Sequence, residues 1–311
     1  MKILIIKLSS LGDIVHAIPS LNALKQKYPQ ATIDWLVYKS FAPIIESQRS
    51  INKIIKLENK KISSLFEIKN QLKKENYDLV IDMQGLIKTA LIARIISSKT
   101  RGFKEPREKI AAIFYKERID AGNIMDDSMH IVERNLLLAQ SPIPHSPFNA
   151  LEQEAKLHKK LCIIPSTTWQ TKLWQAEKWA KLIDSIKSSQ PELEIYILGT
   201  IKELIYIEEI ISQTKSPLHI VVNKKLTDLP EFFSAMSTVI GVDTGPLHIA
   251  AASLYGSKAQ VIGLYGPSSA ARTGPYGFQS ISAAEKPSHK RKNDSSMNLI
   301  SVEQVLNIVT S

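Results

Sequence analysis

The chain has 311 residues, 44% of them hydrophobic and 23% charged, which allows two globular domains and excludes a disordered chain. The single cysteine, Cys162, excludes an internal disulfide and a cysteine-based metal site, and it favours a reducing compartment. The net charge is +10, and residues 1–150 hold most of the excess, with 23 basic against 15 acidic side chains, which indicates an anionic partner.

The first half alternates short apolar runs with amphipathic stretches, a pattern that predicts alternating strands and helices. The predicted strands are residues 2–8, 32–38, 53–57 and 79–82. The predicted helices are residues 14–27, 62–75, 85–97 and 129–140, with two further short segments before the last. Residues 141–150 (SPIPHSPFNA) contain three prolines and are therefore predicted to be a linker.

The alternation restarts after this linker. The predicted strands are residues 161–164, 193–198, 219–222, 238–242 and 260–265, and the predicted helices are residues 177–188, 202–213, 228–236, 247–253 and 302–309. Repeated strand–helix alternation predicts an α/β protein with parallel sheets. We expect two Rossmann-like domains, residues 1–145 and 146–311, that face each other across a cleft, with the last helix able to pack back on the first domain.

No apolar stretch is long enough to span a membrane, and the apolar run at residues 3–6 is too short for a signal peptide. We therefore expect a cytoplasmic protein. Ligands of doubly wound sheets bind at the carboxyl ends of the strands, so the loops that follow the strands are the candidate sites.

The first such loop is SSLGD, residues 9–13. Gly12 permits a tight turn or the close approach of a ligand. Asp13 precedes an apolar helix and can serve either as its N-cap or as an ionised general base toward a sugar hydroxyl. The glycine pattern of a dinucleotide fingerprint is absent from this loop.

Two loops of the second half carry groups suited to a diphosphate. Residues 165–174 (PSTTWQTKLW) offer hydroxyls and Lys172, although the glycines of a P-loop are missing and a plain polar connection fits equally well. Residues 242–248 (VDTGPLH) join an apolar strand to an apolar helix. There Asp243 and Thr244 can cap the helix, Gly245 permits close approach, and His248 lies near the first helical turn.

Several smaller features are consistent either with ligand binding or with a purely structural role. Glu203 follows a strand and could accept ribose hydroxyls or be an exposed helix residue, and residues 82–85 (DMQG) could be a simple turn at a strand end. Arg107, His130 and Arg134, taken singly, are typical of solvated surface residues.

Taken together and in this order, the loops resemble the ADP-heptose:lipopolysaccharide heptosyltransferase family, and in particular its type I members. The resemblance runs nearly from end to end of the chain. It rests on SSLGDIVH (9–16), DMQGLIK (82–88), RE (107–108) before FY (114–115), HIVERN (130–135), STT (166–168) with Lys172 and Trp174, VDTGPLH (242–248) and YGP (265–267).

The resemblance implies a GT-B fold and an inverting transfer of L-glycero-D-manno-heptose from ADP-heptose to a Kdo residue of Kdo-lipid A. It implies that Asp13 is the general base and that Lys172 assists the departure of the diphosphate. The donor site that it implies comprises Thr167, Thr168, Lys172, Glu203, Asp243, Thr244, Gly245 and His248. The implied acceptor site comprises Ser10, Gly12, Lys60, Lys61, Gln84, Arg107 and His130.

No acidic pair with metal-ligand spacing lies in the donor loops, so we expect no obligatory metal or other cofactor. We expect a monomer on the cytoplasmic face of the inner membrane, because Kdo and lipid A are acidic and the first half is basic. The alternatives are heptosyltransferase II or another GT-B transferase, and a nucleotide-binding module without catalysis. A nucleic-acid-binding protein is disfavoured, since no helix-turn-helix, RRM or zinc pattern occurs.

Overall fold

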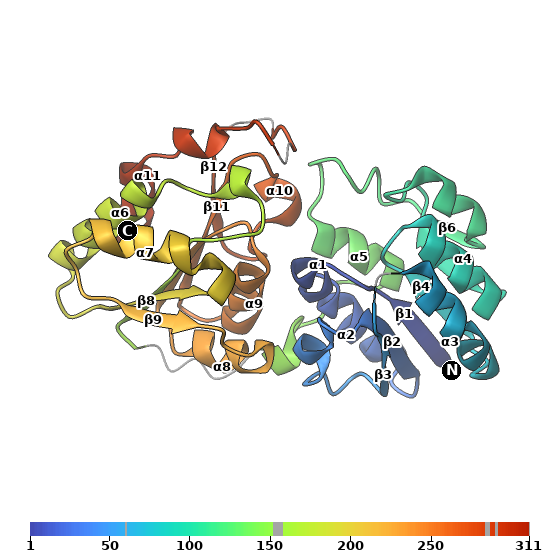
Figure 1. Ribbon diagram of the computed structural model, residues 1–311. Coiled ribbons are helices and arrows are strands. Elements are labelled where there is room, and N and C mark those ends of the chain that lie inside the picture. The colour runs from blue at the N-terminus through green and yellow to red at the C-terminus, as the bar shows by residue number, and fades with distance from the viewer. Residues whose placement is uncertain (60, 152–157, 284–286, 290–291, 311) are drawn as a thin grey trace. The chain divides into compact units, whose positions relative to one another are not determined.

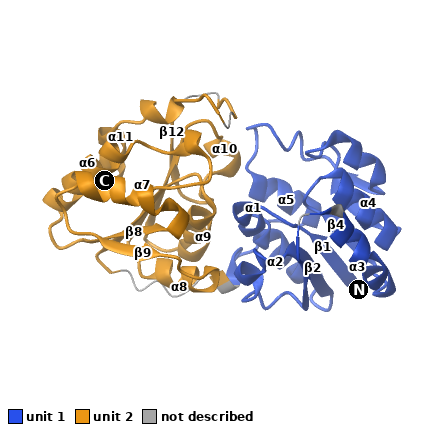
Figure 2. Cartoon of the chain, viewed as in Figure 1, with its two compact units in different colours: residues 1–150 blue, residues 151–311 orange. Residues whose placement is uncertain are grey.

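The computed structural model describes residues 1–59, 61–151, 158–283, 287–289 and 292–310. The chain forms two compact units, Met1–Ala150 and Leu151–Ser311 (Figure 2). The sequence predicts a division after residue 145, but residues 146–150 belong to the first unit. The Pro147 carbonyl accepts a hydrogen bond from Asn22 Nδ2 at 2.8 Å, and the Phe148 side chain is buried.

The first unit contains a six-stranded sheet in the order β3-β2-β1-β4-β5-β6, and every strand pair in it is parallel. Its strands are β1 Lys2–Ile6, β2 Thr32–Tyr38, β3 Lys53–Leu57, β4 Leu79–Asp82, β5 Thr100–Phe103 and β6 Glu117–Ile119. The central strand β1 is an apolar run, KILII, whose isoleucines and leucine are buried, as expected for a strand covered on both faces.

Helices connect these strands (Figure 1). The helical segments are α1 Leu11–Val15, α2 Ile18–Lys27, η1 Ala42–Ile45, α3 Ile62–Lys74, α4 Ile87–Ile96, η2 Lys109–Phe114 and α5 Ile131–Ala139, and η3 Asn149–Leu151 spans the boundary between the units. The helix predicted at residues 14–27 is in fact two helices that are separated at His16 and Ala17. Pro19 lies in the first turn of α2, where a proline is tolerated because its missing N–H has no partner there.

The second unit repeats the design with a parallel sheet in the order β12-β11-β10-β7-β8-β9. Its strands are β7 Lys160–Ile164, β8 Glu194–Gly199, β9 His219–Val222, β10 Thr238–Val242, β11 Gln260–Tyr265 and β12 Gln279–Ser282. The sequence does not predict β12, because this edge strand (QSIS) has a single buried apolar side chain, Ile281.

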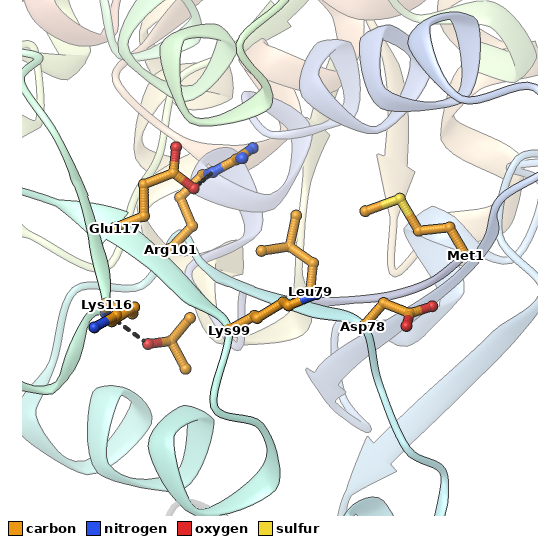
Figure 3. A pocket seen from close by; sticks show the side chains of 8 residues that line it. Met1, Asp78, Leu79, Lys99, Arg101, Lys116 and Glu117 are labelled. Carbon is orange, nitrogen blue, oxygen red and sulfur yellow. Dashed lines mark hydrogen bonds and ion pairs between the residues drawn. The ribbon is translucent and has the colours of Figure 1, made fainter.

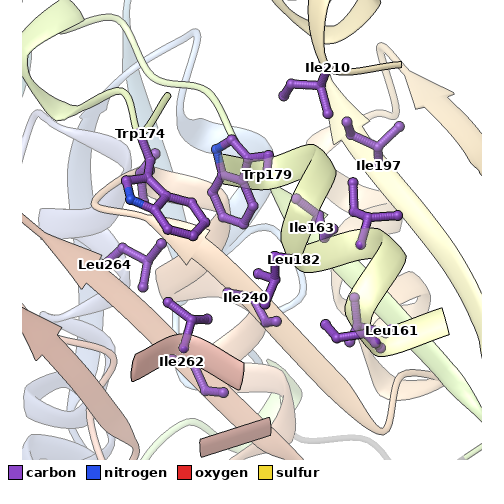
Figure 4. Packing of buried hydrophobic residues seen from close by; sticks show 14 of the residues in the cluster. Leu161, Ile163, Trp174, Trp179, Leu182, Ile197, Ile210, Ile240, Ile262 and Leu264 are labelled. Atoms are coloured by element: carbon purple, nitrogen blue, oxygen red, sulfur yellow. The ribbon is translucent and has the colours of Figure 1, made fainter. Parts of the chain in front are cut away.

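The helical segments of this unit are η4 Gln170–Lys172, α6 Ala176–Ser189, η5 Ile201–Glu203, α7 Leu204–Gln213, η6 Leu226–Asp228, α8 Leu229–Ser234, α9 Gly245–Leu254, α10 Ala270–Thr273, η7 Ser296–Leu299 and α11 Val302–Thr310. Trp174 and Trp179 pack edge to face, 4.9 Å apart, over the β7–β10–β11 surface (Figure 4). The last helix, α11, buries Val305 and Val309 in this same core and packs on α6.

In each sheet the topological switch point lies between the first and the fourth strand of that unit, counted along the chain. In the first unit the chain winds outward in opposite directions from β1 and β4, and in the second unit from β7 and β10. Ligands of open α/β sheets bind at such points, outside the carboxyl ends of the strands. The loops after β1 and β4, and those after β7 and β10, are therefore where the fold itself directs a search for a site.

Candidate functional site

In the first unit, Gln84 ties together the two loops at the switch point. Its side-chain Oε1 accepts hydrogen bonds from the backbone N–H of Leu8 at 2.9 Å and of Ser9 at 3.2 Å. The Gln84 side chain is almost fully buried. Its carbonyl therefore fixes the course of the SSLGD loop, and only its amide group is left for a ligand.

Asp13 lies in the first turn of α1, not at its N-cap, which is Ser10. The Asp13 Oδ2 atom accepts hydrogen bonds from Ser10 N at 2.9 Å and from Ser10 Oγ at 2.7 Å. Burial raises the pKa of the Asp13 carboxyl, but the charge of Lys7, the hydrogen bonds from Ser10 and the charge of Arg107 together bring that pKa below its usual value. Asp13 is therefore ionised at neutral pH, as a general base must be.

Two buried charges lie behind this loop. Lys7, directly after β1, donates a hydrogen bond from Nζ to the Met83 carbonyl at 3.0 Å. Burial lowers the pKa of Lys7, while the charges of Asp13 and Asp82 raise it in part. Asp82 accepts hydrogen bonds from Gln84 N, Gly85 N, Thr89 Oγ1 and Tyr115 OH at 2.7–3.2 Å, which shape the loop after β4.

His130 forms the N-cap of α5, where its Nδ1 accepts a hydrogen bond from Val132 N at 3.2 Å. Its ring contacts that of the buried His16 edge to face, with centroids 5.4 Å apart. The expectation that Arg134 is a solvated surface residue is wrong. Arg134 is fully buried, pairs with Asp126 and donates to the Met129 carbonyl at 3.1 Å, so it fixes the loop that leads into His130.

In the second unit, the loops after β7 and β10 bring three charged or titratable side chains together. Lys172 Nζ lies 2.5 Å from Asp243 Oδ2, and His248 Nε2 lies 3.4 Å from Asp243 Oδ1. The side chains of Lys172 and Asp243 are 12% and 11% exposed, so Lys172 is not the surface lysine of a plain connection. Burial raises the pKa of Asp243, but the hydrogen bond with His248 and the charge of Lys172 together hold that pKa far below its usual value.

The other donor-site candidates surround this cluster in sequence. Thr167 is half-buried and Thr168 is exposed, in the loop between β7 and η4. Thr244 is the N-cap of α9 and Gly245 its first residue. Glu203 lies one strand further along, where its Oε2 accepts hydrogen bonds from Thr200 N at 2.8 Å and from Thr200 Oγ1 at 2.9 Å.

Comparison with known proteins identifies the family. The model of glycosyltransferase family 9 (heptosyltransferase) matches residues 65–300, which is more than half of the chain. The chain belongs to glycosyltransferase family 9.

Curated relatives of this glycosyltransferase include lipopolysaccharide heptosyltransferase 1 of Campylobacter coli, with 28% identity over 80% of each chain. Lipopolysaccharide heptosyltransferase 3 of Escherichia coli K12 is 27% identical over 82% of this chain and 79% of its own. Among solved structures, the E. coli heptosyltransferase WaaC with ADP superimposes with a TM-score of 0.78 and 23% identity. The match covers 100% of this chain and 99% of that one. These likenesses confirm the predicted GT-B architecture and glycosyltransferase class.

Among the described residues, the remaining candidates for acceptor binding in this family 9 glycosyltransferase do not form a cluster like that of Lys172, Asp243 and His248. Arg107 is exposed, yet its charge acts on both Lys7 and Asp13, so it lies within electrostatic reach of the SSLGD loop. Lys61 is the exposed N-cap of α3, and its backbone N–H donates to Asn59 Oδ1 at 2.8 Å. Lys60 lies outside the described residues.

Sequence reasoning missed two residues of these sites. Lys7 is the charged residue that closes an otherwise apolar strand, and its burial beside Asp13 could have been suspected from that position. Trp169 lies under the Lys172 ammonium, 4.2 Å from Nζ to the ring centroid. A lysine three residues after a tryptophan, in a loop that follows a strand, was the available signal for this cation–π contact.

A cavity of about 470 Å³ in the first unit does not coincide with these loops (Figure 3). It is lined by Leu79, Thr100 and Glu117, the first residues of β4, β5 and β6, and so lies at the amino edge of the sheet. Within the described ranges, no three or more His, Cys, Asp or Glu side chains are grouped as metal ligands would be. No helix in that same part of the chain has the length and apolar content to cross a membrane.

Proposed function

We propose that this family 9 glycosyltransferase moves L-glycero-D-manno-heptose from ADP-heptose to a Kdo residue of Kdo-lipid A in lipopolysaccharide inner-core biosynthesis, with inversion. The observation that carries the donor half is the Lys172–Asp243–His248 cluster at the switch point of the second unit. The acceptor half rests on the ionised Asp13 at the switch point of the first unit.

On the donor side, Lys172 and the N-terminus of α9 provide positive charge for a diphosphate. Asp243 holds the Lys172 ammonium in place before the donor arrives. The hydroxyls of Thr167 and Thr168 and the backbone at Thr244 and Gly245 supply further donors, and Glu203 is suited to accept from ribose hydroxyls.

On the acceptor side, Asp13 removes the proton of the attacking sugar hydroxyl as that oxygen bonds to the anomeric carbon. The bond from that carbon to the diphosphate breaks in the same step, and ADP leaves with the bonding electrons. Attack from the face opposite the leaving group inverts the anomeric centre. Arg107, His130, Lys60 and Lys61, with Ser10, Gly12 and Gln84, are the proposed contacts of the acidic acceptor.

We propose that no metal or other cofactor takes part. A departing diphosphate can be stabilised by a lysine and a helix N-terminus, which are preorganised donors of positive potential. Both are present beside Asp243.

A second candidate acceptor has its own support. The similarity to lipopolysaccharide heptosyltransferase 3 of E. coli K12 is nearly equal to that shown by the type 1 relative from Campylobacter coli. A chain of that type would use the same donor loops and a different acceptor. Trials with acceptors that carry Kdo alone and acceptors that already carry heptose would separate the two.

The acceptor is membrane-borne, so we propose that the protein works as a monomer at the anionic cytoplasmic face of the inner membrane. The basic excess of residues 1–150 supports this location. Each basic side chain near such a surface contributes about 1 kcal/mol of attraction.

The test of the proposed function is ADP release by the purified protein. We expect release from ADP-heptose to require Kdo-lipid A and to vanish in Asp13→Ala. Release without acceptor, or equal release with ADP-mannose, would contradict the proposed substrates.

A further inference from the structure

The 3₁₀ helix η2 presents two isoleucines to solvent. Ile110 and Ile113 are 59% and 64% exposed. They are three residues apart, and a 3₁₀ helix has three residues per turn, so both lie on the same edge of η2. The opposite side of the segment faces inward, since Ala111 and Phe114 pack with Ala90 of α4 and with Tyr115.

The segment is held firmly to the rest of the first unit. The Glu108 backbone N–H donates to the Gly85 carbonyl at 3.0 Å, and Glu108 Oε2 accepts from Ile87 N at 2.6 Å. The Ala111 N–H donates to the Glu108 carbonyl at 2.8 Å. The exposure of the two isoleucines is therefore a property of a fixed element that is anchored at the start of α4.

The chain segment that contains η2 is basic. Residues 99–118 carry seven lysines and arginines against three glutamates. Arg101 and Lys104 pair with Glu117 and Asp120. The exposed basic side chains of this segment that make no salt bridge to any described residue are Lys99, Arg107, Lys109, Lys116 and Arg118.

The second unit offers an instructive contrast. Ile201 and Ile205, on η5 and α7, are also exposed, at 63% and 83%. Their neighbours in the chain include one basic residue, Lys202, and three acidic residues, Glu203, Glu208 and Glu209. Exposed isoleucines alone are ordinary on a protein surface. What distinguishes η2 is an exposed apolar pair in a basic chain segment, several of whose exposed lysines and arginines make no salt bridge within the described part of the chain, and this combination favours the interface of an anionic bilayer.

We propose that η2 is the membrane-docking element of this protein, with Ile110 and Ile113 inserted among the headgroups of anionic lipids and the surrounding lysines and arginines on the lipid phosphates. This inference deepens the proposed function, because it rests on an acceptor that resides in a membrane. It places the lipid surface beside Arg107, one of the proposed acceptor contacts.

The test is flotation of the full-length protein with vesicles of phosphatidylcholine containing phosphatidylglycerol, and with phosphatidylcholine alone. We expect the wild type to bind the anionic vesicles and to lose binding as salt rises. The I110D/I113D variant should bind them at least about tenfold more weakly, because two apolar anchors are replaced by like charges to the lipid. I110A/I113A, which keeps good helix formers, should also lose binding, to a smaller degree.

The matched control is I201D/I205D, which removes two isoleucines of the second unit that are at least as exposed as the η2 pair, and it is used for flotation only. It should bind as the wild type does. Equal loss in the control and in the η2 variants would overturn the proposal, as would unchanged binding of folded I110D/I113D. If the wild type bound neutral vesicles with the same affinity as anionic vesicles, the proposed role of the lysines and arginines would be overturned.

A second readout separates this inference from the proposed function. Transfer to a water-soluble Kdo-containing acceptor, measured without vesicles, should be retained in I110D/I113D. If the wild type shows no such transfer while its vesicle binding still depends on the isoleucines, the proposed function fails and the docking element stands. If transfer proceeds and the isoleucines have no influence on flotation, the docking element fails alone.

Discussion

Asp13 and Glu203 occupy the same local arrangement, one in each unit. Each carboxylate accepts from both the backbone N–H and the hydroxyl of a residue three positions earlier, Ser10 in one case and Thr200 in the other. These two local hydrogen bonds at a helix start hold the carboxylate in place. The position of Asp13 therefore depends directly on Ser10.

Substitution of Asp13 by alanine should lower turnover by about 10²–10⁴-fold, the usual contribution of a general base. Donor binding should be unchanged, since the donor loops lie in the other unit. Steady-state ADP release measures turnover, and the shift of the thermal midpoint on addition of the donor measures donor binding. Ser10→Ala serves as the graded control and should reduce turnover less, because the carboxylate remains but loses its hydroxyl partner. A near-normal rate for Asp13→Ala would remove Asp13 from this role.

The Asp243 carboxylate gives a prediction about stability and pH. Its pKa is lowered in the folded protein, so it stabilises the fold above the unfolded pKa of about 3.9, and that contribution is lost as pH falls toward the folded pKa. Asp243→Asn should therefore lower stability by about 1.5–3 kcal/mol at pH 7. The difference from the wild type should shrink below about pH 4.

Calorimetric melting across this pH range measures the effect. The double variant K172M/D243N should be more stable than the sum of the two single changes predicts, because it leaves neither charge alone. A pH-independent difference between Asp243→Asn and the wild type would show that the ion pair is not its origin.

At the scale of elements, most strands and their order along the chain could be predicted because central parallel strands are continuous apolar runs. Of the four edge strands, β6 (ERI) and β12 (QSIS) could not, since they are short and polar and their assignment depends on a neighbouring strand, whereas β3 and β9 could. The site was predictable only in part for a related reason. Lys172 and Asp243 are 71 positions apart, and nothing in either loop reveals that β7 and β10 are adjacent.

The seam between β7 and β10 depends on Gly241. A Cβ atom at that position would lie 2.9 Å from Ile164 Cβ and 3.1 Å from the Ile164 carbonyl oxygen. Gly241→Ala should force the two strands apart just below the donor loops, at a cost of about 1–3 kcal/mol in stability, and should raise the KM for ADP-heptose.

The matched control is Gly256→Ala, where the backbone φ is +76° and no atom lies within 4 Å of the added Cβ. That change strains a turn remote from the seam, so it should lower stability and leave the KM for the donor unchanged. A donor KM that rises equally in both variants would mean that general destabilisation, not the β7–β10 seam, sets donor affinity.

At the scale of the whole molecule, the two units share one topology and differ in charge. Each sheet has the same strand order relative to its own first strand, and each has a carboxylate fixed by a capping hydroxyl near its carboxyl edge. Residues 151–311 carry 17 basic against 15 acidic side chains, so they are nearly neutral beside the basic first unit. This division fits the proposed function, in which one scaffold is used twice, for an anionic acceptor and for a nucleotide.

The proposal that no metal takes part makes a prediction for the whole enzyme. Treatment with EDTA followed by desalting should leave the rate of ADP release unchanged, and added Mg²⁺ should not raise it, because Lys172 and the α9 N-terminus carry the leaving-group charge. A loss of activity that Mg²⁺ restores would contradict the metal-free mechanism.

The contact between Lys172 and Trp169 has an optical consequence. Of the four tryptophans, Trp35, Trp174 and Trp179 are fully buried, whereas Trp169 is only partly covered and has the ammonium of Lys172 against its ring. Nearby charge and solvent set the emission of an indole, so any ligand that draws Lys172 away changes the intrinsic fluorescence of the protein. The native chain thus contains its own reporter for occupancy of the proposed nucleotide site, and Trp169→Phe would remove that signal while leaving the three buried emitters in place.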